Sequence, residues 1–98
     1  MAADGNWNIV VSTPMGERHA TLSVKTEGGA LKGSQTADGN STQIFEGTVN
    51  GDDVAWKVSI TDPMEMTLEF AGKVTGDNIG GSVKLGMFGS SSFSGTRA

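Results

Sequence analysis

The sequence contains no cysteine and no tyrosine, and it has a single histidine, His19. Without cysteine the chain can form neither disulfide bonds nor thiolate metal sites. One histidine excludes a His-rich metal site, and a Ser-His-Asp arrangement would have to use that residue. We expect His19 on the outward face of a strand, where a solvated histidine is favoured over a catalytic base. The sequence therefore predicts no catalytic residue, no metal, no cofactor and no enzymatic activity.

Long apolar runs and clusters of basic residues are also missing. No run could span a membrane, and residues 1–5 (MAADG) have neither the basic region nor the apolar core of a signal peptide. The Lys and Arg residues number 7, are scattered, and leave a formal net charge of -4, so we expect neither nucleic acid nor an anionic membrane as a partner. Two interpretations of the compartment stay open: a cytoplasmic protein, or a module of a longer, exported chain.

Glycine is abundant, at 15 residues, while proline occurs only twice. Glycine mixed with Val, Ile, Thr, Phe and Trp is typical of many short strands joined by tight turns. No segment of about ten residues carries a helical apolar stripe without a glycine break. A chain of 98 residues is expected to form one domain, 1–98, with a modest core.

One pattern occurs twice and indicates how the strands are arranged. Residues 45–58 (FEGTVNGDDVAWKV) are repeated at 70–83 (FAGKVTGDNIGGSV), with Phe, Gly, Val, Gly and Asp at matching positions. Each copy reads as a β-hairpin whose turn is built on Gly-Asp. The Asp and Asn residues of these turns have turn chemistry as their simplest role, because the turns lack the ligand count of a calcium loop.

Apolar residues alternate through most of the chain and predict eight strands. We expect them at about 6–12, 17–26, 30–36, 42–49, 54–61, 65–74, 79–85 and 92–97. The fourth strand would place Phe45, Gly47 and Val49 inward. Because each strand follows its neighbour directly, we predict an all-β, eight-stranded antiparallel up-and-down meander barrel, with a β-sandwich as the alternative. Such an interior holds side chains or one small ligand.

Glycines at inward positions of these strands support the barrel, because a small barrel needs sharply bent strands. They are Gly33, Gly47, Gly72, Gly81 and Gly95.

The two ends of the sequence resemble the calycin superfamily of barrels, which includes lipocalins, fatty-acid-binding proteins and avidins. Gly5-Asn6-Trp7 opens the first strand as the G-x-W signature does in that group, and Arg97 ends the last strand, where the group places an Arg across the Trp. The resemblance implies that Arg97 stacks on the Trp7 ring, a contact of roughly 0.5 to 2 kcal/mol. It also implies that Gly5, Trp7 and Arg97 form a structural plug at the closed end of the barrel.

Two further resemblances concern the middle and the tail of the chain. Residues 29–34 (GALKGS) and 54–57 (VAWK) are similar to avidin strands, but biotin binding does not carry over, because the avidin pocket uses several Trp and a Tyr. Residues 62–70 (DPMEMTLEF) and 86–97 resemble small bacterial β modules found alone or at the C-terminal end of exported hydrolases. That likeness implies a non-catalytic accessory domain.

In a meander, alternate connections lie at the same end of the barrel. Turns 27–29, 50–53 and 75–78 would gather at the closed end with Trp7. The opposite, open end would collect an apolar set, namely Met15, Met64, Met66, Met87 and Phe88. A deformable apolar patch of this kind suits a small hydrophobic ligand or a protein surface.

Two functions compete for this open end. In the first, the chain is a non-enzymatic binding module whose Met-rich open end contacts an apolar small molecule or a protein partner. In the second, the Met and Phe side chains fold over a filled core as a lid. The chain would then be a structural accessory domain with no ligand, packing against another domain or protomer.

Overall fold

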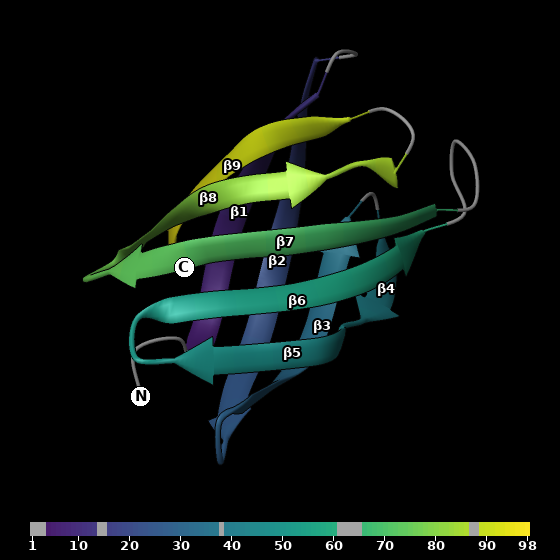
Figure 1. The fold of residues 1–98 in the computed structure, drawn as a ribbon. Helices are drawn as coiled ribbons and strands as arrows, with labels where there is room; N and C mark the ends of the chain where they lie inside the picture. The colour runs from purple at the N-terminus through teal and green to yellow at the C-terminus, as the bar shows by residue number, and fades with distance from the viewer. Residues whose placement is uncertain (1–3, 14–15, 38, 61–65, 87–88) are drawn as a thin grey trace.

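A computed structural model describes residues 4–13, 16–37, 39–60, 66–86 and 89–98. These residues form strands almost throughout (Figure 1). The strands are β1 (Gly5–Thr13), β2 (Gly16–Glu27), β3 (Ala30–Ala37), β4 (Asn40–Gln43), β5 (Phe45–Asn50), β6 (Asp53–Ile60), β7 (Met66–Thr75), β8 (Asn78–Lys84) and β9 (Ser90–Arg97). No helix in the described ranges is long and apolar enough to cross a membrane.

The strands form one antiparallel sheet that closes on itself. Its order is β2-β1-β9-β8-β7-β6-β5-β3-β4, and an additional β2–β3 pairing joins the two sides. Figure 1 shows β5 to β8 crossing in front of β1 to β3 at a steep angle, as expected for the tilted strands of a small barrel. The predicted meander barrel is confirmed, with eight strands in the ring and β4 as an extra strand beside β3.

The extra strand arises because the predicted strand 42–49 is interrupted at Ile44. Before the interruption Gln43 pairs with Ser34 of β3, and after it Gly47 pairs with Leu31. The β5–β6 register shifts by a bulge between Phe45 and Thr48. A bulge inserts one residue and therefore changes which residues face inward.

The bulge changes the direction in which Phe45 faces. Ile44 is buried, at 5% exposure, whereas Phe45 is 39% exposed. The prediction that Phe45 faces the interior is therefore wrong. Glu46, at the bulge, has a φ of 51°, a left-handed conformation that is uncommon for any residue except glycine.

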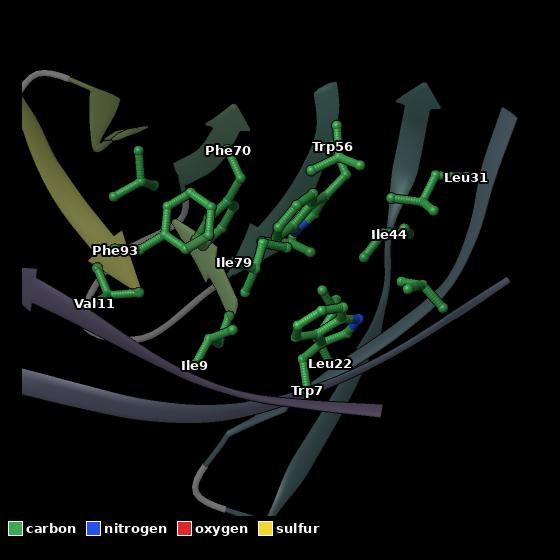
Figure 2. Close-up of a cluster of buried hydrophobic side chains, with 14 of the residues drawn as sticks. Trp7, Ile9, Val11, Leu22, Leu31, Ile44, Trp56, Phe70, Ile79 and Phe93 are labelled. Atoms are coloured by element: carbon green, nitrogen blue, oxygen red, sulfur yellow. The ribbon is translucent and has the colours of Figure 1, made fainter. Parts of the chain in front are cut away.

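The barrel interior is filled by side chains that alternate along the strands. Trp7, Leu22, Val58 and Val83 are completely inaccessible to solvent. Three aromatic rings form the centre: the Trp56 and Phe70 rings stack with centroids 4.9 Å apart, and Phe93 meets both edge-on, at 5.6 and 5.2 Å. Figure 2 shows side chains of β1 pointing toward these rings. Such pairs contribute beyond the area they bury.

One polar side chain enters this core, and one inward glycine lets two strands approach closely. Gln35 is only 8% exposed, and its Oε1 accepts a hydrogen bond of 3.3 Å from Trp56 Nε1. Gly81 pairs with Gly72 of β7 and with the buried Phe93 of β9, so its register position is the predicted inward one. A Cβ atom on Gly81 would lie 2.1 Å from the Ala71 carbonyl oxygen, so close backbone approach requires glycine there.

Candidate functional site

Arg97 organises the closed end of the barrel. Its guanidinium carbon lies 4.3 Å from the centroid of the Trp7 ring, which is the predicted stacking. Arg97 Nη1 donates a hydrogen bond of 2.7 Å to the Asp4 carbonyl, and Nε donates one of 3.2 Å to Asp77 Oδ1. A Cβ atom on Gly5 would lie 3.1 Å from Arg97 Nη1, so the glycine leaves room for the guanidinium. Arg97 therefore lies close to both of the other predicted closed-end residues, Gly5 and Trp7.

Asp4 ties the same end to β2. Thr26 lowers the pKa of the Asp4 carboxyl through its hydroxyl and its backbone N–H. Of these two contacts, the geometry supports the backbone N–H, which donates to Asp4 Oδ1 at 2.7 Å. Thr26 Oγ1 is buried and has no hydrogen-bond partner in the described part of the chain. A carboxylate that accepts a backbone hydrogen bond favours its charged form.

The predicted open-end site is only partly covered by the structure. Met66 begins β7, pairs with Ile60 and is half-buried. Met15, Met64, Met87 and Phe88 lie outside the described residues. The grouping of these side chains therefore stays a prediction.

The single histidine lies where the sequence predicts it. His19 is exposed on β2 and pairs with Val10 of β1, as its predicted outward position requires. Within residues 4–13, 16–37, 39–60, 66–86 and 89–98, no three His, Cys, Asp or Glu side chains are placed to hold a metal ion.

The bulge creates a cavity in the outer wall of the barrel, and we call it the Phe45 notch. It has a volume of about 440 Å³. The residues around it are Leu31, Lys32, Gln43, Ile44, Phe45, Glu46 and Gly47. Leu31 and Ile44 are buried, so the Phe45 ring, the Lys32 ammonium, the Gln43 amide and the Glu46 carboxylate carry its chemistry.

Charges around the notch follow from the strand register. Lys57, which pairs with Phe45, forms ion pairs with Glu46 at 2.9 Å and Glu69 at 3.8 Å. Both carboxylates raise the pKa of the Lys57 ammonium, and the hydrogen bond with Glu46 contributes most. Lys32 takes part in none of the ion pairs between described residues, and it lies directly opposite Lys25 of β2. Like charges opposite each other on a sheet are unfavourable.

Sequence reasoning missed this notch, although one signal for it is present. Inward positions continue as Ile44, Gly47 and Val49, so the alternation changes parity between Ile44 and Gly47. The repeat concealed that change, because it matches Phe45 with Phe70 in sequence. Phe70 is buried, at 2% exposure, whereas Phe45 is exposed.

A second, shallower groove lies on the outer face of β5 to β8. It has a volume of about 550 Å³, and Thr48, Ala55, Ala71, Lys73 and Gly80 contribute to its lining. Three of its small lining residues, Thr48, Ala55 and Ala71, share one register row.

Comparison of the chain with protein-family models, with curated proteins and with solved structures gives no match.

Proposed function

We propose that this barrel is a non-enzymatic binding module that meets its partner with its outer surface. The observation that carries the proposal is the Phe45 notch, where an aromatic ring that is 39% exposed lies beside a cavity. The interior offers less, because Trp7, Trp56 and Phe70 fill it. Bulges are frequent next to functional sites, where they redirect a side chain, as this bulge redirects Phe45.

The open end is the second surface on which the same module could bind. Met66 is half-buried at the first residue of β7, next to the connection that holds Met64. At this end the sequence favours binding of a small hydrophobic ligand or a protein partner.

A structural accessory domain is the alternative, and a row of small side chains on the outer face favours it. Small side chains cross from β5 to β9 in one register row: Thr48, Ala55, Ala71, Ser82 and Ser92. Such a row lets another surface approach the sheet closely. In this alternative the barrel packs against another domain or protomer and has no ligand.

We further infer a kinship with the calycin barrels. The contact between Arg97 and the Trp7 ring at the closed end supports it, because the resemblance implied this pair of residues. The closed up-and-down topology supports it as well.

A titration with the fluorescent probe 8-anilinonaphthalene-1-sulfonate tests the binding proposal. We expect the wild-type chain to enhance probe fluorescence, and Phe45→Ser to weaken that binding by at least about fivefold, because the exposed ring is removed. Met66→Asp reports on the open end, and Lys84→Gln, at an exposed position of β8, is the matched surface control.

Each result of the titration selects one interpretation. Loss of binding in Phe45→Ser alone supports the notch, and loss in Met66→Asp alone moves the site to the open end. A wild-type chain that leaves the probe unchanged contradicts an apolar binding surface and favours the accessory domain.

A further inference from the structure

We propose that the Phe45 notch binds the ring of a carboxylate-bearing sugar. The proposal depends on the binding module described above and names the class of ligand that this site takes. It combines an aromatic platform, a cation that has no partner in the described part of the chain, and neutral polar groups around one cavity.

The Phe45 ring supplies the platform. It projects from the outer wall, while Ile44 turns inward and closes the base of the notch. A sugar ring carries its C–H bonds on one face and its hydroxyl groups around the edge. The C–H face can cover an exposed aromatic ring while the edge stays in contact with polar groups, as happens when amphipathic rings pack on protein surfaces.

Lys32 supplies the charge. It lines the notch, lies directly opposite Lys25, and makes no ion pair with any described residue. Folding alone disfavours two opposed ammonium groups on one sheet, in a chain that has only 7 basic residues. A bound carboxylate would relieve this repulsion, because charge-assisted hydrogen bonds form between ammonium and carboxylate groups.

The charge of the acidic residue at the notch is partly offset. Glu46 lies 2.9 Å from Lys57 Nζ on β6, the strand on the other side of β5 from Lys32, although Lys57 also pairs with Glu69. The remaining lining group is the Gln43 amide, which can donate to and accept from hydroxyl groups.

The notch is also held in shape. The Glu46 backbone stays in a left-handed conformation that a non-glycine residue rarely adopts, and it is flanked by the pairs Phe45–Lys57 and Thr48–Ala55. Strained residues of this kind collect at ligand sites. The cavity volume of about 440 Å³ lies within the range of small-molecule sites, and it suits one or two sugar rings.

The lining separates an acidic sugar from two related ligands. A purely aromatic acid would cover Phe45 and pair with Lys32 but make no hydrogen bond to the exposed Gln43 amide, so it would gain less than an acidic sugar. A neutral sugar would make no ion pair with Lys32. Both ligands serve as comparisons in the experiment.

The experiment is a titration of the ¹⁵N-labelled chain, followed by two-dimensional amide NMR. The probes are digalacturonate, a neutral galactose disaccharide and benzoate. We expect digalacturonate to bind with a dissociation constant of about 1 mM or below and to shift the amides of Lys32, Gln43 and Glu46. The neutral disaccharide should bind at least about fivefold more weakly, because it lacks the carboxylate.

Three variants assign the contacts. Phe45→Ala and Lys32→Gln should each weaken digalacturonate binding by at least about fivefold. Lys84→Gln is the matched control for lost charge on the same outer wall, and it should change binding less than about twofold. Phe45 and Lys32 are both exposed, so the variants should keep the amide spectrum of the folded barrel.

The outcomes separate this inference from the binding-module proposal. If benzoate or the neutral disaccharide binds as tightly as digalacturonate, or if Lys84→Gln weakens binding as much as Lys32→Gln, the acidic-sugar assignment is wrong. If digalacturonate fails to bind while the fluorescent probe still depends on Phe45, the ligand class fails and the binding module stands. If digalacturonate fails to bind and the wild-type chain also leaves the fluorescent probe unchanged, the binding module is refuted as well.

Discussion

Arg97 holds together parts of the chain that are distant in sequence. Its side chain contacts the Trp7 ring, the Asp4 carbonyl and the Asp77 carboxylate, and its backbone N–H donates to the Asp77 carbonyl at 2.9 Å. The contact between Arg97 and Trp7 was predictable because the G-x-W pattern and the terminal Arg resemble those of the calycin barrels, and that resemblance implies the stacking.

Replacing Trp7 tests how much the closed end contributes to stability. Trp7→Ala should lower the free energy of unfolding by roughly 3 to 5 kcal/mol, because it removes a fully buried aromatic side chain and leaves a cavity. Urea denaturation measures this change. Phe45→Ala is the control, since it removes an exposed ring and should cost less than about 1 kcal/mol. A denaturation midpoint that Trp7→Ala leaves unchanged contradicts the plug.

The lowered pKa of Asp4 predicts a pH dependence. A carboxyl whose pKa falls on folding stabilises the native state above its unfolded pKa, and this contribution disappears as the pH falls through the folded pKa. Asp4→Asn should therefore be less stable than wild type at pH 7, and the two should converge below about pH 4. Urea midpoints across this range measure the effect, with Asp52→Asn in an exposed turn as control. A difference that stays constant with pH would exclude the carboxylate as its cause.

Gln35 shows where residue types mislead. Strand alternation puts Leu31, Gly33 and Gln35 on one face, yet a polar side chain is not expected inside a barrel. Its partner, Trp56 Nε1, is 21 positions away in sequence, so only the closed fold shows how the amide is satisfied.

At the scale of elements, β5 departs most from what the sequence predicts. The repeat suggests that β5 and β7 orient their first Phe alike, but Phe45 faces out and Phe70 faces in. Two facts conceal the bulge: its left-handed residue is Glu46 rather than glycine, and a register shift depends on pairing with β3 and β6. Most other strand orientations follow from simple alternation, including Trp7 and Ile9 on β1.

The left-handed conformation of Glu46 predicts that a Gly variant is more stable than a Val variant, the opposite of the order expected at Glu69 on β7. Glu46→Gly and Glu46→Val lose the same ion pair with Lys57, so their difference isolates the backbone. A β-branched residue is penalised in this conformation, so the Val variant should be less stable than the Gly variant by about 1 to 2 kcal/mol.

Glu69 provides the matched control, because it also pairs with Lys57 but lies in regular β7. There the order should reverse, with Glu69→Val more stable than Glu69→Gly by up to about 1 kcal/mol. Urea denaturation of the four variants measures both differences. The same order at the two positions would mean that Glu46 carries no conformational strain.

The two candidate sites also differ in how far the sequence predicts them. The open-end set was inferred from where a meander places its connections, and only Met66 of that set falls on described residues. The Phe45 notch depends on a one-residue shift in the β5–β6 register, which the residue types of β5 do not predict. Its lining also combines residues from β3, β4 and β5, so their proximity comes from the fold rather than from spacing in the sequence.

At the scale of the whole molecule, the barrel is closed by strands from both ends of the chain. β1 lies between β2 and β9, and the backbone N–H of Ala98 donates to the Asn6 carbonyl at 2.8 Å. The last pairing of the ring joins β2 to β3 over seven residue pairs, from Thr21 with Thr36 to Glu27 with Ala30. β4, in contrast, has β3 as its only strand partner in the described part of the chain.

This difference between β2 and β4 makes closure testable by amide hydrogen exchange. Without the β2–β3 pairing, both strands would be edges of one open sheet. In the closed barrel, amides of β2 that point toward β3 are hydrogen-bonded, and we expect them to exchange at least about a hundredfold more slowly than the amides of β4 that point away from β3. β8, which lies between β7 and β9, supplies the reference for full protection. Protected β2 amides that match β8 support closure, whereas β2 amides that exchange as fast as those of β4 would show that the ring opens in solution.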